Sequence, residues 1–384
     1  MLVYLALDVI PVACMVASVA VKTATRSDIV AFWLMAALLI LIGALRGRTV
    51  GTDTGGYLLG AYGESRINSL EFFYRYSKYS SWDPLFKLVL WLTGHWSPTM
   101  MPVQLACSAL TVIPIFMSLA GMAKMNSRFS PWPGVAVYTL LFYPASFNLI
   151  RQSIAMSFVV FAYYLSMKRR WFRAFLPLIV AVGFHKSAVV VVPLVLLCAL
   201  RSLPLRRYDA VRYAVLTVGA IAVLFAAPLL QWATSVLGIY GHYADGTVSA
   251  GPGGRRSWLE ICFIAVVLVV AHRRLSVPSA LPERFSRELS TVCLMGAVLY
   301  GLCVVNLFLY RIGLYYLYFF ILYAPCLMDV TAMAPVFSKA RHFDGAAARR
   351  AALLGCLVLL ACLVFSIDYY FICKMNEVVP YVFL

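Results

Sequence analysis

Long apolar runs separated by short polar clusters form the main pattern along this chain. Several of the runs reach the roughly 20 residues that an α-helix needs to cross a bilayer. The runs lie at about 2–21, 29–45, 101–121, 132–147, 152–167, 174–184, 188–200, 213–237, 258–271, 289–309, 312–328 and 351–372. This pattern predicts an all-α, polytopic integral membrane protein, with about 12 transmembrane helices in a single domain over residues 1–384.

Basic residues are distributed unequally between the two sets of connections. The connections at 22–28, 122–131, 168–173, 201–212, 272–288 and 329–350 hold 20 of the 32 Lys and Arg residues, and the opposite set holds the other 12. Cytoplasmic loops of membrane proteins are enriched in Lys and Arg, so the first set is expected in the cytoplasm. Both chain termini and a polar loop at 46–83 then face outward.

Two segments do not fit a simple series of spans. Residues 80–100 are interrupted by charged residues and proline, which predicts an interfacial or re-entrant helix on the outer side. The 174–200 run has basic residues at both ends, yet its 27 residues cover only about 40 Å as helix, where two crossings need roughly 60 Å. Its tip, Phe184 to Ala188, is therefore expected below the outer surface, where it is shielded by protein or lines a wet cavity. The alternative is that the flanking basic residues snorkel out of longer helices and place the tip nearer the surface.

Composition agrees with the membrane class and excludes other classes. Hydrophobic residues make up 63% of the chain and charged residues 12%, which is far more apolar than a soluble domain. The net charge of +17 falls mostly in clusters between apolar runs, so no nucleic-acid partner is expected. The 10 cysteines lie in or beside apolar runs without metal-binding spacing, and they are interpreted as small buried hydrophobes. The first run lacks a basic n-region, which favours a retained helix over a cleaved signal peptide.

Cations gather on the predicted outer side. A glycine-rich turn carries Arg46, Arg48 and Asp53. Glycine backbone approaches an anion closely, and arginine offers forked donors that match phosphate oxygens. The simplest ligand for several such cations at one membrane level is a lipid-linked phosphate or diphosphate.

Further ionisable residues on the same side begin or interrupt apolar runs. They are Arg151, His185, Lys186 and Arg311. Ionisable groups at such depth are costly and tend to be functional. No Asp-x-Asp pair occurs in the chain, so the usual carboxylates for a metal-bridged nucleotide-sugar donor are missing and no metal site is expected.

Short motifs in these segments occur in a recognisable order. They are Arg48 with Gly51-Thr52-Asp53 and Tyr57, Asn148 with Arg151-Gln152, Phe184-His185 with Ser187-Ala188, Arg311-Ile312-Gly313 with Tyr315-Tyr316, and Val379-Pro380-Tyr381. Together they span residues 46–381, and the set resembles the EpsG family of Wzy-like bacterial polysaccharide polymerases. The resemblance implies a GT-C-like membrane fold and polymerisation of undecaprenyl-diphosphate-linked oligosaccharide repeat units. It places this reaction on the periplasmic face of the bacterial inner membrane.

The resemblance also implies partners and roles for residues. Expected partners are the lipid-linked oligosaccharides, membrane lipid, a chain-length regulator and a flippase, and no cofactor is expected. The candidate residues are Arg151, Arg311, Arg48 and Arg46 for the diphosphate, Asp53 or His185 for the general base, and Gln152, Tyr57, Lys186 and Asn148 for substrate binding. Charge grows on the diphosphate as it leaves, so cations already in place lower the barrier. We prefer Asp53 as the base, with His185 then binding sugar or phosphate.

Each candidate also has an ordinary structural interpretation. Arg46 and Arg48 suit interfacial anchors, Arg151 an interhelix salt bridge, and Arg311 a snorkelling arginine. In the same way, His185 suits a core histidine.

Some residues are expected to have only structural or solvent roles. Asp53 also suits a turn residue that bonds its own backbone. The side chains of Tyr315, Tyr316 and Tyr318 are interpreted as core or interfacial belt, and those of Glu64, Glu71, Asp83 and Asp368 as solvated.

Two other functions remain open from the sequence. A transporter or flippase for the same lipids predicts inverted repeats and polar interruptions near the bilayer midplane, whereas these charges gather toward one face. An O-antigen ligase or another GT-C transferase would use the same donor with a different acceptor.

Overall fold

The computed structural model of the chain describes residues 2–21, 26–126, 129–225, 263–267, 269–270, 281–300, 310–327, 345–372, 374 and 378–383. Within these ranges the chain consists of helices and their connections. The β-type pairing found there is a bridge between Arg46 and Phe383. The predicted all-α class is therefore confirmed for the described part.

The first half of the chain forms long helices separated by a loop of short helices. The elements are α1 (Leu2–Val21), α2 (Arg26–Ala44), the π-helical turn η1 (Thr54–Leu58), α3 (Leu59–Ile67), α4 (Leu70–Arg75), α5 (Pro84–Gly94), α6 (Met101–Met125), α7 (Trp132–Val137), the π-helical turn η2 (Tyr138–Phe142), the 3-10 turn η3 (Pro144–Phe147) and α8 (Ile150–Met167). The predicted 132–147 span is thus broken into three pieces. Pro144 accounts for the second break, because proline has no N–H to continue the helix.

The second half contains shorter helices. The described elements are α9 (Trp171–Phe184), the 3-10 turn η4 (Lys186–Val191), α10 (Val192–Ala199), the 3-10 turn η5 (Leu200–Ser202), α11 (Leu205–Leu224), α15 (Glu283–Tyr300), α16 (Tyr310–Leu317), α17 (Phe320–Leu327), α19 (Gly345–Ser366) and the π-helical turn η8 (Ile367–Ile372). The predicted 312–328 span is divided between α16 and α17. Half of the 258–271 run lies outside the described residues, and so do the ends of the 213–237 and 289–309 runs.

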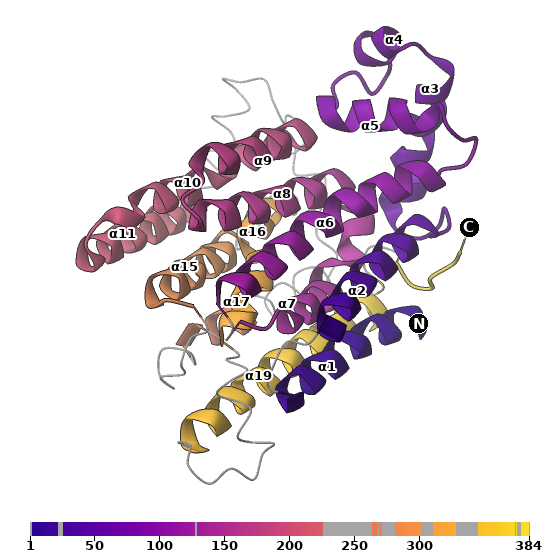
Figure 1. Cartoon of the computed structure of the whole chain (residues 1–384). Helices are drawn as coiled ribbons and strands as arrows, with labels where there is room; N and C mark the ends of the chain where they lie inside the picture. The colour runs from indigo at the N-terminus through magenta and orange to yellow at the C-terminus, as the bar shows by residue number, and fades with distance from the viewer. Residues whose placement is uncertain are drawn as a thin grey trace.

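The long helices form a bundle with the folded loop at one end. Figure 1 shows α3, α4 and α5 together at the upper right, and both chain termini on the same side. This matches the prediction that the termini and the 46–83 loop share one face. The 80–100 segment contains the 11-residue helix α5, and its interfacial position stays a prediction.

Glycines permit the closest helix contacts. A Cβ on Gly121 of α6 would lie 2.1 Å from the ring of Tyr164 on α8. A Cβ on Gly313 of α16 would lie 2.5 Å from the backbone nitrogen of Tyr300 on α15. Small residues at helix crossings let backbones approach within a membrane, where packing rather than hydrophobic expulsion holds helices together.

Two described helices are long and apolar enough to cross a bilayer by themselves, at Met101–Met125 and Leu353–Ile372. Shorter apolar helices lie at Asp28–Ala44, Pro84–Gly94, Trp132–Phe142 and Trp171–Phe184. The membrane character predicted from composition agrees with this, whereas the number of 12 spans stays a prediction. The outer face of the bundle is apolar, as Leu34, Phe175 and Leu357 show by their exposure.

A buried polar cluster ties the helices together at the opposite end from α5. Glu288 of α15 is fully buried and accepts hydrogen bonds from Arg201 Nε at 2.8 Å and from the Tyr208 hydroxyl. Arg201 Nη1 also donates to Ser166 Oγ of α8 at 2.9 Å. These groups join α8, η5, α11 and α15, so they hold this end of the bundle together.

Candidate functional site

Asp83, at the start of α5, is the centre of a polar cluster. It is only 3% exposed, and its carboxylate accepts from Arg151 Nη1 at 3.0 Å and from the backbone N–H of Lys186 at 3.0 Å. The Nδ1 atom of His185 lies 3.4 Å from the same Oδ2 that binds Arg151. The expectation that Asp83 is solvated is therefore wrong, because donors from α8 and the hairpin tip enclose it.

The charge of Asp83 is stabilised despite its burial. Burial by itself raises the pKa of this carboxyl, but the hydrogen bond and charge of His185, the charge of Arg151 and the Lys186 N–H together lower the pKa below its ordinary value. Asp83 is thus an ionised partner for Arg151 and a hydrogen-bond partner for His185 rather than a proton acceptor.

Arg151, at the start of α8, is held by aromatic rings as well as by Asp83. Its guanidinium carbon lies 4.6 Å from the centre of the Trp82 ring and 5.6 Å from that of Tyr57. Stacking and ion pairing together fix the plane of the guanidinium. The side chain of Arg151 is 22% exposed, so part of it remains accessible. The interhelix salt bridge considered from the sequence is present.

Asp53 and Tyr57 adjoin this cluster from the glycine-rich turn. The Tyr57 hydroxyl donates to Asp53 Oδ2 at 2.6 Å, and the Asp53 N–H donates to Asn148 Oδ1 at 3.2 Å. Burial raises the pKa of the Asp53 carboxyl, and the Tyr57 bond and the charges of Arg311 and Arg151 offset only part of this rise. Asp53 therefore binds a proton more readily than Asp83 does.

The hairpin of α9, η4 and α10 brings its tip into the cluster. His185 and Arg151 approach the same oxygen of Asp83, so the tip lies beside Arg151. Ser187 Oγ lies 3.1 Å from the Tyr315 hydroxyl of α16, so the tip also contacts that helix. Lys186 is exposed, and its Nζ lies 3.4 Å from the carbonyl oxygen of Ser81.

Gln152 and Arg311 connect α8 to α16. Gln152 Nε2 donates to the backbone oxygen of Arg311 at 2.6 Å, and Gln152 is almost fully buried. The charge of Arg311 acts on the pKa of Asp53, so the two residues lie on the same side of the bundle. The site thus draws on five separate segments of the chain.

Arg46 occupies a different environment from the other arginines. It is 1% exposed, donates from Nε to Thr54 Oγ1 at 3.3 Å and from Nη1 to the Gly43 carbonyl, and lies over the Phe147 ring at 4.8 Å. Protein groups therefore enclose its guanidinium, which makes it a brace for the loop rather than an accessible cation. Arg48, two residues later, is exposed.

The tyrosines that follow Arg311 lie in the protein core. Tyr315, Tyr316 and Tyr318 are at most 2% exposed, as predicted. Asp368 is 9% exposed and thus buried, so the expectation that it is solvated is wrong. All of the described cysteines are free thiols. Five of them are buried, and Cys356 is exposed.

The sequence missed Asp83 and Trp82 as site residues. The available signal was the Asp83-Pro84 pair, which is typical of a helix start and brings Asp83 to the edge of a helix rather than into open loop. Within the described ranges, no group of three or more His, Cys, Asp or Glu residues is arranged to hold a metal ion.

The fold and the site define the class of the protein. It is a helical membrane protein in which arginines, carboxylates and a histidine form a polar cluster at one end of the helix bundle. A family model described as the EpsG family matches residues 29–383, nearly the whole chain, and the chain belongs to this family. It is accordingly a polysaccharide polymerase-like membrane protein. No curated protein and no solved structure matches the chain.

Proposed function

We propose that this protein is a glycosyltransferase that joins undecaprenyl-diphosphate-linked oligosaccharide repeat units on the periplasmic face of the inner membrane. The observation that carries the proposal is the convergence of Arg151, His185, Asp83 and Asp53 at one end of an apolar bundle. A lipid-linked diphosphate sugar presents its charged group at that level, between the hydrocarbon and the water. We also propose that the helices adopt a GT-C-like fold.

The diphosphate is bound by arginines in this proposal. Arg151 is oriented by Asp83 and by the rings of Trp82 and Tyr57, so its remaining donors are preorganised for phosphate oxygens. Arg311 and the exposed Arg48 supply further positive charge from α16 and from the glycine-rich turn.

The reaction is a substitution at the anomeric carbon. A sugar hydroxyl of one lipid-linked unit attacks the anomeric carbon of another chain, a new C–O bond forms, and the bond to the diphosphate breaks with its electron pair leaving on the diphosphate. Asp53 takes the hydroxyl proton, because its raised pKa suits a general base better than the lowered pKa of Asp83. His185 then contacts sugar or phosphate beside Asp83.

The same site argues against the transporter and leaves the ligase as the second candidate. Charged groups of an alternating-access transporter are expected near the bilayer midplane at the centre of a repeat, whereas this cluster lies at the α5 end. A ligase would share the donor chemistry of Arg151 and differ only in its acceptor, so the product distinguishes the two.

The test uses Arg151→Lys and Arg151→Ala in a strain that lacks the native gene. Lysine keeps the charge but loses the planar fork, so Arg151→Lys is expected to lose much of the polymer while membrane abundance stays normal. Arg151→Ala is expected to lose about 10²- to 10³-fold in rate, the usual effect of removing one charge-stabilising donor. The readouts are polymer length on a gel and the amount of protein in the membrane.

Arg75→Lys and Arg75→Ala are the matched controls, because Arg75 ends α4 in the loop that also carries Asp83, and its side chain is 69% exposed. These variants are expected to make normal polymer. Long polymer from well-expressed Arg151→Ala would overturn the assignment of Arg151. Transfer of finished chains to a different acceptor, without lengthening, would favour the ligase.

A further inference from the structure

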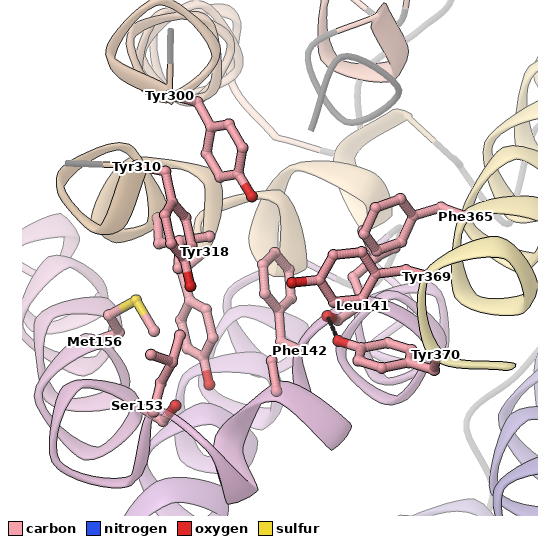
Figure 2. Close-up of a pocket in the computed structure, with 13 residues that line it drawn as sticks. Leu141, Phe142, Ser153, Met156, Tyr300, Tyr310, Tyr318, Phe365, Tyr369 and Tyr370 are labelled. Atoms are coloured by element: carbon pink, nitrogen blue, oxygen red, sulfur yellow. Dashed lines mark hydrogen bonds between the residues drawn. The ribbon is translucent and has the colours of Figure 1, made fainter. Parts of the chain in front are cut away.

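A pocket separate from the polar cluster lies between the helices of the C-terminal half and α8. Figure 2 shows tyrosines from α15, α16 and η8 around it, with Phe142 of η2 and Met156 of α8 completing the wall. About 440 Å³ of space free of atoms lies within the pocket and in the solvent at its open mouth. Two of its walls, η2 and η8, are π-helical turns, a conformation that is frequent at functional sites.

The pocket begins at the level of the proposed diphosphate site and continues toward the other end of the bundle. Tyr310, which lines it, precedes Arg311, and Leu149, which also lines it, lies two residues before Arg151. Met156 lines it five residues after Arg151 on α8, about 7 Å deeper along the helix axis. The Gln152–Arg311 hydrogen bond joins the two helices that carry these residues.

The pocket offers mainly the faces of rings and aliphatic side chains. The Tyr370 hydroxyl donates to the Leu141 carbonyl at 2.7 Å, and the Tyr318 hydroxyl lies 3.5 Å from Ser157 Oγ. These hydroxyls are therefore occupied by protein groups, which leaves their aromatic surfaces toward the space. Such a lining suits a hydrocarbon chain better than the hydroxyls of a sugar.

We propose that this pocket holds the first isoprene units of the polyprenyl chain while the diphosphate lies at Arg311 and Arg151. This inference rests on the proposed function and adds the lipid half of the donor site. The chain already lies in an apolar solvent, so the pocket gains its specificity from shape and from contacts with rings, and the bound diphosphate brings the chain to it. Holding the chain there aligns the anomeric carbon with Asp53.

The first test is photolabelling of the purified, full-length protein. Two probes are used, a polyprenyl diphosphate sugar with a diazirine on its first isoprene unit and the same molecule with the diazirine on its sugar. The prenyl probe is expected to label Met156 or Tyr310, and undecaprenol without a diphosphate is expected to label them far less. Labelling of these residues by the sugar probe instead would overturn the proposal, and equal labelling by undecaprenol would show adventitious lipid only.

The second test fills the pocket. Ala145, a half-buried wall residue, is changed to Phe, and the exposed Ala13 of α1 is changed to Phe as the control. Ala145→Phe is expected to lower prenyl labelling and polymer yield about tenfold at normal protein abundance, the size expected of one steric clash, whereas Ala13→Phe leaves both unchanged. Normal polymer from Ala145→Phe with labelling outside the pocket would overturn this inference but leave the proposed function standing. Absence of polymer synthesis by the unchanged protein would instead overturn the proposed function.

Discussion

At the scale of single residues, the same residue type has different roles according to its partners. Asp53 and Asp83 both belong to the outer loop, yet burial dominates the pKa of Asp53, while His185 and Arg151 lower that of Asp83. Two carboxyls with opposite pKa shifts in one site are typical of a division between a proton acceptor and a charge partner. The structure therefore adds Asp83 to the residues whose substitution is informative.

Asp83→Asn is expected to destabilise the protein by roughly 2–4 kcal/mol, because it leaves a largely buried arginine without its anion. The folded-state pKa of Asp83 is lowered, so its stabilising contribution is fully present above the ordinary carboxyl pKa of about 3.9 and is lost as the pH falls through the lowered value. The measurement is the melting temperature in detergent at several pH values.

Glu71→Gln is the matched control, because Glu71 pairs with Arg75 at 3.6 Å on the surface of the same loop, with its side chain 70% exposed. Exposed pairs contribute little, so the melting temperature of this variant is expected to stay unchanged. Equal effects of the two variants would show that the Asp83–Arg151 pair is no more important than a surface contact.

At the scale of elements, the end of the chain supports the glycine-rich turn. The Gly47 N–H donates to the Val382 carbonyl at 2.6 Å, and the Tyr4 hydroxyl donates to the Val378 carbonyl at 3.0 Å. Arg46 also holds the turn, because its Nε donates a hydrogen bond to Thr54, the first residue of η1. The segment at 378–383 is thus packed beneath the turn that carries Asp53 and Tyr57.

Arg46→Gln and Arg48→Gln form a matched pair that separates support from ligand binding. Arg46→Gln is expected to lower the free energy of unfolding by about 1–3 kcal/mol, since its buried partners lose their donors, and to lower protein abundance and polymer together. Arg48→Gln is expected to lower polymer at normal abundance. The readouts are melting temperature, membrane abundance and polymer length, and a stable Arg46→Gln protein without polymer would return Arg46 to the diphosphate site.

At the scale of the whole molecule, the two polar clusters mark opposite ends of the bundle. Ser166, bonded to Arg201, lies fifteen residues after Arg151 on α8, about 22 Å along the helix axis. This separation approaches the thickness of a bilayer core, about 30 Å, so we expect the Asp83 cluster and the Glu288 cluster near its two surfaces. The proposed reaction requires the Asp83 cluster to be the one at the periplasmic surface.

Single-cysteine labelling in a cysteine-free background tests this orientation. A cysteine at Glu64 is expected to react with a membrane-impermeant reagent added to the periplasmic side, whereas one at Arg206 is expected to react only after the membrane is opened, because the basic 201–212 connection is assigned to the cytoplasm. Both positions lie outside the proposed site. Strong labelling at 206 with none at 64 would invert the topology and remove the site from the periplasmic face.

The sequence by itself determined the properties that depend on local composition. Apolar runs of spanning length specify membrane helices, as the helices at Met101–Met125 and Leu353–Ile372 illustrate, because each helix satisfies its own backbone hydrogen bonds and can contact lipid with its side chains. The length of the 174–200 run likewise predicted a short hairpin with its tip below the outer surface, and the structure brings that tip beside Arg151. The family motifs supplied Asp53, Arg151 and His185, and the structure brings these residues to one end of the bundle.

Only the tertiary structure decided which charges have partners. Asp83 and Glu71 look alike in the sequence, yet one is enclosed by Arg151 and His185 and the other is exposed. Arg46 and Arg48 are two residues apart, yet only Arg46 is enclosed by the loop and the chain's last segment. Burial and pairing depend on neighbours supplied by distant segments, and hydrophobic periodicity carries no information about which segments meet.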